Sequence, residues 1–166
     1  MSLDTILDHV DGDLENSIAR LMDLMRIQSI STDSKYSDEC ISAAEWLVDD
    51  LMSIGFNAEI RETPGHPMVM AKGGEGGIHT LFYGHYDVQP IDPIELWENH
   101  PFEPKLEETK NGPVIRGRGA SDDKGQLMTF IEACRAFKDV TGSLPNKISI
   151  FFFPKRFSEL NSSKNT

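Results

Sequence analysis

Two short polar segments of this 166-residue chain contain residue types that bind metal ions. The first is GHYDVQP at 84–90, which follows an apolar stretch. His85 and Asp87 are two residues apart, so in extended backbone their side chains point to the same side. A neutral imidazole is a good zinc ligand, and a carboxylate beside it can accept its other ring N–H. The alternative for so short a motif is a polar pair in a turn.

The second segment is GRGASDDKG at 117–125, between a predicted strand and a predicted helix. A carboxylate such as Asp122 has two oxygens and can bridge two metal ions, as in paired-metal hydrolases. The alternative is that Asp122 or Asp123 caps the following helix by accepting from its free N–H groups. The order Asp-Lys-Gly excludes a phosphate-binding P-loop, and the acids lack the spacing of a calcium loop.

The elements that must position these residues alternate between helix and strand. Apolar spacing predicts helices over 16–27, from Ser37 or Asp38 to Gly55, and over 124–139. Strands are predicted at 56–62, 67–71, 78–88, 114–119 and 147–153. We expect 78–88 to be covered on both faces, because its later residues are consecutively apolar. The pattern predicts an α/β domain with a largely parallel or mixed sheet, whose strand ends face the ligand-binding crevice.

Two further segments lie outside this alternation. Residues 89–112 are rich in proline and charge, and we interpret them as a long ordered loop in which Trp97 and Phe102 pack against the domain wall. After Pro154 the sequence PKRFSELNSSKNT shows no periodicity. We therefore expect residues 1–153 to form the domain and residues 154–166 to be a disordered tail.

Composition excludes several classes of protein. The chain has 16 Lys and Arg against 27 Asp and Glu, for a formal net charge of −11. This charge disfavours nucleic acids and anionic membrane surfaces as partners. No apolar stretch approaches the ~20 residues that span a bilayer. Cys40 and Cys134 cannot form a disulfide framework, so we expect buried free thiols and a cytoplasmic location.

Three segments taken together resemble a known enzyme family: GHYDVQP (84–90), LWENHPFEP (96–104) and VIRGRGASDDKGQ (114–126). They are similar to the zinc-dependent family of aminoacylases, glutamate carboxypeptidases, succinyl-diaminopimelate desuccinylases and carnosinase-like dipeptidases. The likeness is greatest to the dipeptidase branch and extends over most of residues 12–153. It implies a partial three-layer α/β/α catalytic domain, incomplete at its C-terminal side, and a small peptide or N-acyl amino acid as substrate.

The resemblance also implies roles for individual residues. His85 would be a terminal ligand of one zinc ion, and Asp87 would be the catalytic-site carboxylate that orients His85. Asp122 would bridge the two zinc ions, with the peptide bond after it in cis. Asp123 and Lys124 would set the turn and begin the helix.

Part of the family's site has no counterpart in this sequence. In the family, the strand equivalent to 148–153 leads to adjacent glutamates, which supply the general base and a metal ligand. Here it leads to Pro154-Lys155-Arg156. The acids after Asp123 are Glu132, Asp139 and Glu159, and no histidine follows His100. A catalytic zinc usually needs three protein ligands, so we expect an inactive N-terminal fragment, from a truncated or frame-shifted reading frame, with weak or absent zinc binding.

Two other functions stay open at this point. The chain could be a non-catalytic α/β binding module or relic that associates with a full-length relative. It could also bind magnesium and phosphates through Asp87, Asp122 and Asp123, because carboxylates suit that ion. In either case, a sheet that stops after Phe151-Phe152-Phe153 would leave an open edge, which predicts self-association.

Overall fold

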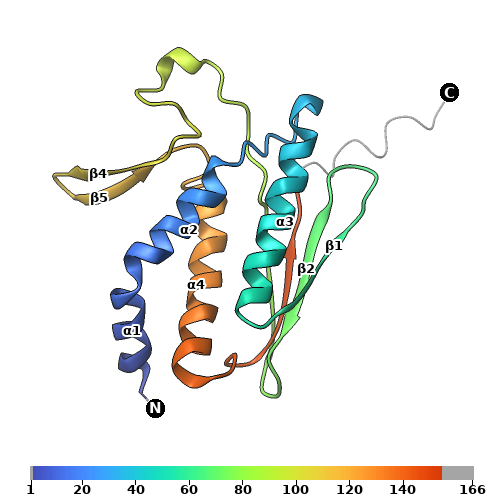
Figure 1. Ribbon diagram of the computed structural model, residues 1–166, viewed down its shortest axis with the longest axis vertical. Helices are drawn as coiled ribbons and strands as arrows, with labels where there is room; N and C mark the ends of the chain where they lie inside the picture. Colours follow the sequence, from blue (N-terminus) through green and yellow to red (C-terminus); the bar gives the residue numbers. More distant parts are fainter. Residues whose placement is uncertain (1, 155–166) are drawn as a thin grey trace.

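The computed structural model describes residues 2–154, which form a mixed sheet, a separate hairpin and helices packed against the sheet (Figure 1). The α-helices are α1 (Leu3–Gly12), α2 (Leu14–Arg26), α3 (Ser37–Ser53) and α4 (Lys124–Thr141). The strands are β1 (Asn57–Arg61), β2 (Met68–Gly73), β3 (His79–Gly84), β4 (Lys105–Thr109), β5 (Gly112–Arg116) and β6 (Lys147–Phe152). Short 3-10 turns lie at η1 (Ser34–Tyr36) and η2 (Ile94–Leu96).

The main sheet has the strand order β1-β2-β6-β3. Strand β2 is antiparallel to both β1 and β6, whereas β3 is parallel to β6. The parallel pair needs a long crossover, which the chain makes through the hairpin and α4 before it returns as β6. The predicted α/β class with a mixed sheet is therefore confirmed. The predicted open edge at 151–153 is wrong, because β6 lies in the sheet interior and β3 forms the edge.

One face of the sheet carries the core. Alternate residues of β6 point into it, because successive side chains of a strand point to opposite faces. The core includes Ile148, Ile150 and Phe152 of β6, Leu47 and Leu51 of α3, and Leu127 and Ile131 of α4. The rings of Phe82 in β3 and Phe130 in α4 stack at a centroid distance of 3.9 Å. This contact holds the end of β3 beside the first turns of α4.

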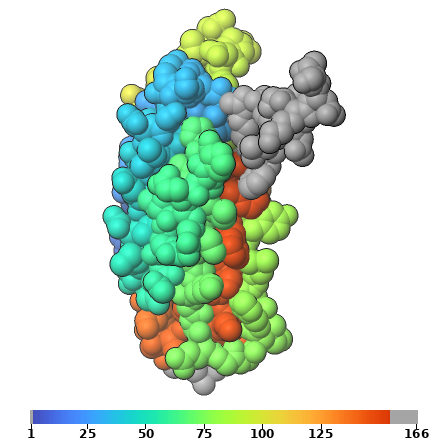
Figure 2. All heavy atoms as spheres, turned by 90° about the vertical axis from the view of Figure 1, so that its right-hand side faces the viewer, coloured from blue at the N-terminus to red at the C-terminus, as the bar shows by residue number. Residues whose placement is uncertain are grey.

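The opposite face of β3 is open. Leu81 is 61% exposed and Tyr83 is 71% exposed, so none of the helices described within residues 2–154 covers them. The prediction that both faces of 78–88 are buried is thus wrong for the described part of the chain. Figure 2 shows the sheet from this side. The orange-red strand β6 has the green strands β1 and β2 on one side and yellow-green residues of the β3 region on the other.

Two predicted strands have different bounds. Strand β3 ends at Gly84, and the backbone beyond it leaves the sheet. The strand expected at 114–119 is β5, which pairs only with β4 and not with the main sheet. Strand β4 falls in the predicted long loop and pairs with β5, with Lys110 and Asn111 between the two strands and Gly112 at φ 104°. The Asn-Gly sequence at 111–112 is the sequence signal for the missed hairpin.

None of the helices between residues 2 and 154 has the length and apolar character needed to cross a bilayer. Apart from Pro154, the predicted tail at 154–166 lies outside the described residues.

Candidate metal site

His85 and Asp122 come together at the end of β3. The Nε2 atom of His85 lies 2.9 Å from Oδ1 of Asp122. The imidazole side chain is 17% exposed and the carboxylate is 68% exposed, so the pair is accessible from solvent. Both residues line a pocket of about 490 Å³, together with Phe82, Tyr83, Gly84, Asp123, Gln126 and Phe153.

Asp87 lies behind His85, on the side away from Asp122. Its side chain is 1% exposed, and its Oδ1 is 3.2 Å from Nδ1 of His85. The main-chain oxygen of Asp87 is 3.0 Å from the same nitrogen. Because both partners are acceptors, Nδ1 carries a proton, and Nε2 is the nitrogen that faces Asp122 and the pocket. The hydrogen bond to the Asp87 side chain, with a smaller one to Asp122, raises the pKa of His85 to about 9 in spite of its burial.

Asp122 reaches the pocket from a turn and not from the tip of a strand. The hairpin of β4 and β5 ends at Arg116, and the turn that follows leads into α4 at Lys124. The strand before this turn, β5, is not part of the main sheet, so the two side chains meet from the end of β3 and from the turn before α4. The Asp122–Asp123 peptide bond is cis, as the resemblance implied.

Asp123 has a different partner from Asp122. It occupies the residue before α4, but its side chain makes no capping hydrogen bond to that helix. Its Oδ2 instead accepts from the main-chain N–H of His85, at 3.1 Å. A Cβ on Gly84 would lie 2.8 Å from the same oxygen, so only glycine fits there without a shift. Asp123 therefore joins the turn before α4 to the end of β3.

Lys124 anchors the same turn to the end of α2. The side chain is fully buried, and its Nζ donates to the main-chain oxygens of Leu24, at 3.0 Å, and Ile27, at 2.7 Å. Leu24 lies in the last turn of α2 and Ile27 is the residue after it, so Lys124 ties α4 to the end of α2. Burial lowers the pKa of Lys124 to about 7. The resemblance implied that Lys124 would help to set the turn and begin the helix, and α4 does begin at this residue.

Two serines were not identified from the sequence. Ser29 and Ser31 lie between the helices predicted at 16–27 and from Ser37 or Asp38, yet they are 0% and 3% exposed. The hydroxyl of Ser29 donates to the Tyr86 main-chain oxygen at 2.8 Å, and that of Ser31 donates to Oδ2 of Asp87. The only sequence signal is the pattern Ser-Ile-Ser at 29–31, in which the two hydroxyls share one side of extended backbone.

The described residues supply fewer ligands than a metal ion needs. Within residues 2–154, no group of three or more His, Cys, Asp or Glu side chains is placed to hold a metal. His85 and Asp122 fit the donor types of zinc, and the Asp87 contact on Nδ1 is the support that ligating histidines usually have. A catalytic zinc needs at least one more protein ligand. The magnesium alternative is not supported, because Asp87 faces Ser31 and His85 while one Asp123 oxygen faces the main chain.

Other predicted candidates lie in structural contacts. Phe102 is 3% exposed, and the Trp97 indole donates to the Ile91 main-chain oxygen at 3.1 Å, in keeping with packing roles. The other histidines each contact a group outside the site: His9 with Asp139, His66 with the Ser31 oxygen, His79 with Ser149, and His100 with the Phe102 N–H.

Comparison with known proteins agrees with the motifs. Residues 81–155 match the model of peptidase family M20/M25/M40. The chain is 28% identical over 164 residues to the Cys-Gly metallodipeptidase dug1 of Schizosaccharomyces pombe, covering 92% of this chain and 34% of that protein. It is 35% identical over 115 residues to the succinyl-diaminopimelate desuccinylase of Marinobacter nauticus, covering 69% and 28%.

Solved structures show the same relationship. The di-peptidase Dug1p of Saccharomyces cerevisiae aligns with a TM-score of 0.82 at 26% identity, over 92% of this chain and 34% of that one. Human carnosine dipeptidase 1 shares the fold, with a TM-score of 0.84 at 24% identity, over 97% and 36%. The resemblance stated from the motifs is confirmed, and the chain spans about a third of the length of these relatives.

Proposed function

We propose that this chain, which is related to the peptidases of family M20/M25/M40, forms the N-terminal part of a dinuclear metal site that hydrolyses a peptide or amide bond. The observation that carries the proposal is the contact between Nε2 of His85 and Oδ1 of Asp122, with Asp87 on Nδ1. A small peptide or an N-acyl amino acid is the proposed substrate, since the matched relatives are named as a dipeptidase and a desuccinylase.

The residues of this chain have separate proposed roles. His85 offers Nε2 to one zinc ion, and Asp122 bridges two. Asp87 keeps Nδ1 protonated and the imidazole plane in place, which makes it a positioning group. When bound, zinc ions in such a site supply a Lewis acid and an activated water. The Asp122 side chain is 68% exposed. A metal ion bound to it could therefore take its remaining ligands from outside residues 2–154.

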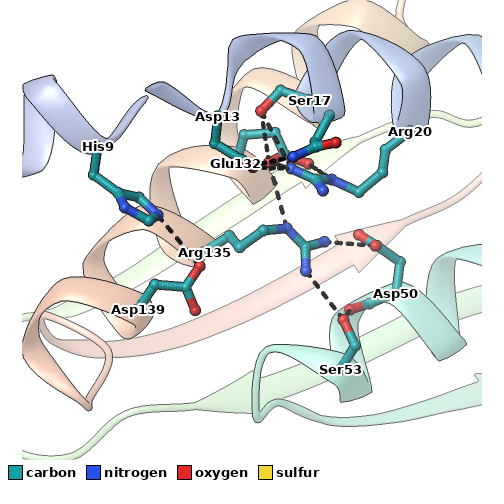
Figure 3. Close-up of polar contacts among 10 residues, drawn as sticks. His9, Asp13, Ser17, Arg20, Asp50, Ser53, Glu132, Arg135 and Asp139 are labelled. Atoms are coloured by element: carbon teal, nitrogen blue, oxygen red, sulfur yellow. Dashed lines mark hydrogen bonds and ion pairs between the residues drawn. The ribbon is translucent and has the colours of Figure 1, made fainter. Parts of the chain in front are cut away.

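We further propose that the isolated chain does not catalyse this reaction. The described acids that follow Asp123 have other partners. Glu132 is surrounded by Arg20, Arg135 and Ser17, and Asp139 pairs with His9 at 3.4 Å (Figure 3). Neither faces the pocket at His85, so neither can act there as a general base. Loss of a general base typically costs about 10²–10⁴ in rate.

A hybrid enzyme tests the proposal directly. Residues 1–153 of this chain would replace the aligned part of the S. pombe metallodipeptidase, and hydrolysis of unblocked dipeptides would be followed with zinc present. We expect turnover that falls by about 10² or more in the His85→Ala and Asp122→Ala variants. Asp23→Ala, on an exposed ion pair in α2, is the matched control and should not change turnover.

A hybrid without turnover would contradict the proposal, and so would either of two other results. One is a hybrid whose turnover survives His85→Ala. The other concerns inactivity alone: stoichiometric zinc binding with dipeptide turnover by residues 1–166 would show that the chain is a complete enzyme.

A second candidate function is non-catalytic association with another copy or with a full-length relative. The observation that favours it is the open face of edge strand β3, with exposed Leu81 and Tyr83. Edge strands that lack a partner invite pairing with another chain. For either function we propose a reducing compartment such as the cytoplasm, because Cys40 and Cys134 are buried free thiols.

A further inference from the structure

We propose that Ser31 is a positioning residue for His85 and acts through the carboxylate of Asp87. Ser31 is 3% exposed and donates its hydroxyl hydrogen to Oδ2 of Asp87. The other oxygen of that carboxylate lies 3.2 Å from Nδ1 of His85. The serine thus sits one step behind the aspartate, on the far side from the imidazole. Its importance for metal binding rests on the proposed function, whereas its effect on the imidazole does not.

The main chain holds Ser31 in register with Asp87. The N–H of Val88 donates to the oxygen of Ser29 at 2.9 Å, and Ile30 forms a parallel bridge with Val88. The segment 29–31 therefore runs beside 86–88 like a very short pair of parallel strands. Nε2 of His66 lies 2.9 Å from the Ser31 main-chain oxygen and holds the segment from its other side.

A hydrogen bond to Oδ2 decides where Oδ1 points. An aspartate carboxylate turns easily about its last torsion, which is broad and roughly two-fold. With Oδ2 held by the Ser31 hydroxyl, Oδ1 is held toward Nδ1 of His85. Groups that orient a ligand through such an outer contact commonly change metal affinity or activity by about 10–100-fold when removed. A fixed Oδ1 keeps the proton on Nδ1 and leaves Nε2 facing Asp122.

Ser29 provides a matched comparison within the same segment. It is equally buried, and its hydroxyl also donates to the 86–88 segment. Its acceptor, however, is the main-chain oxygen of Tyr86 and not the carboxylate. If a buried serine here served only to satisfy polar groups, removal of either hydroxyl would affect the His85 ring to the same extent. If Ser31 positions the imidazole, only its removal changes the environment of His85.

The test is the ¹⁵N NMR spectrum of the histidine rings in the metal-free chain of residues 1–166, assigned with His85→Gln. Ser31→Ala is expected to shift both ring nitrogens of His85. Ser29→Ala is expected to leave them at the wild-type positions, and Ser31→Thr, which keeps a hydroxyl, to restore them. The unmutated chain gives an independent measurement: the Ser31 hydroxyl proton should exchange slowly with water.

Three results would overturn the inference: unchanged His85 ring nitrogens in Ser31→Ala, equal shifts in Ser29→Ala, or rapid exchange of the Ser31 hydroxyl in the unmutated chain. None of these measurements uses a metal or a substrate. A hybrid enzyme without turnover would contradict the proposed function alone, and the NMR result would still decide the role of Ser31.

Discussion

His85 and Asp122 are 37 residues apart in the sequence, and Nε2 of the first lies 2.9 Å from Oδ1 of the second. The neighbouring Asp123 also faces His85, but it accepts from the main-chain N–H at 3.1 Å. Two adjacent carboxylates thus hold one histidine in two ways. One contacts its side chain in the pocket, and the other holds its backbone.

The two aspartates should differ in their effect on folding. Asp122 is largely exposed, so Asp122→Ala should change the free energy of unfolding by about 0.5 kcal/mol or less. Asp123→Ala removes a charge-assisted hydrogen bond that joins β3 to α4 and should cost about 1–2 kcal/mol. Urea denaturation followed by circular dichroism measures both. Equal losses in the two variants would contradict this division of roles.

A partly buried ion network around Glu132 should contribute to stability. Glu132 of α4 accepts from Nε of Arg20 at 2.7 Å and from its Nη2 at 2.6 Å, and its side chain is 13% exposed (Figure 3). Glu132→Ala leaves Arg20 and Arg135 with fewer counter-charges and should cost about 2–3 kcal/mol. The control Asp23→Ala breaks a pair with Arg26 in which both side chains are more than half exposed. It should cost about 0–1 kcal/mol in the same urea titration. A cost equal to that of Glu132→Ala would show that the Glu132 contacts add no more stability than an exposed ion pair.

The two thiols should be protected in the folded chain. Burial raises the pKa of Cys40 to about 12, with a smaller contribution from the charge of Asp87, and burial raises the pKa of Cys134 to about 12. At pH 8 both are protonated when folded, whereas unfolded thiols ionise near pH 8.5. The folded state binds these protons more tightly, so the contribution of the two thiols to stability is fully present below about pH 8 and is lost as the pH rises toward 12.

Alkylation with iodoacetamide at pH 8 checks this point. We expect modification of Cys40 and Cys134 only after addition of denaturant. Rapid reaction of either thiol in the native chain, detected by mass spectrometry, would be inconsistent with the burial described.

The open face of β3 should control self-association. Leu81→Lys places a charge on this face, where the side chain is 61% exposed, so it should change stability by about 0.5 kcal/mol or less. We expect light scattering to show a smaller mass for this variant than for the unmodified chain. Leu96→Lys is the control, because Leu96 is 77% exposed but lies in η2, outside the sheet. If Leu96→Lys lowers the mass equally, the β3 face is not the contact.

The sequence itself determined the local part of this protein. Apolar spacing predicted α3, α4 and β6 within a few residues, because each pattern is set by neighbours along the chain. The motif at 84–90 identified His85 and Asp87 as a pair for the same reason, since two residues of extended backbone bring them to one side. The resemblance of three motifs to a peptidase family added Asp122, whose distance from His85 along the chain no local pattern could bridge.

Tertiary structure alone decided which distant groups support these residues. The hydroxyl of Ser31 meets Asp87 across 56 positions of sequence, and Nζ of Lys124 reaches the end of α2 across 97 and 100 positions. Serine and lysine side chains are mostly exposed in folded proteins, so no local pattern predicted that these two would be buried. Tertiary packing buries them. The same packing placed β6 inside the sheet and left β3 at its edge, because strand order follows from non-local pairing and not from the pattern within any one strand.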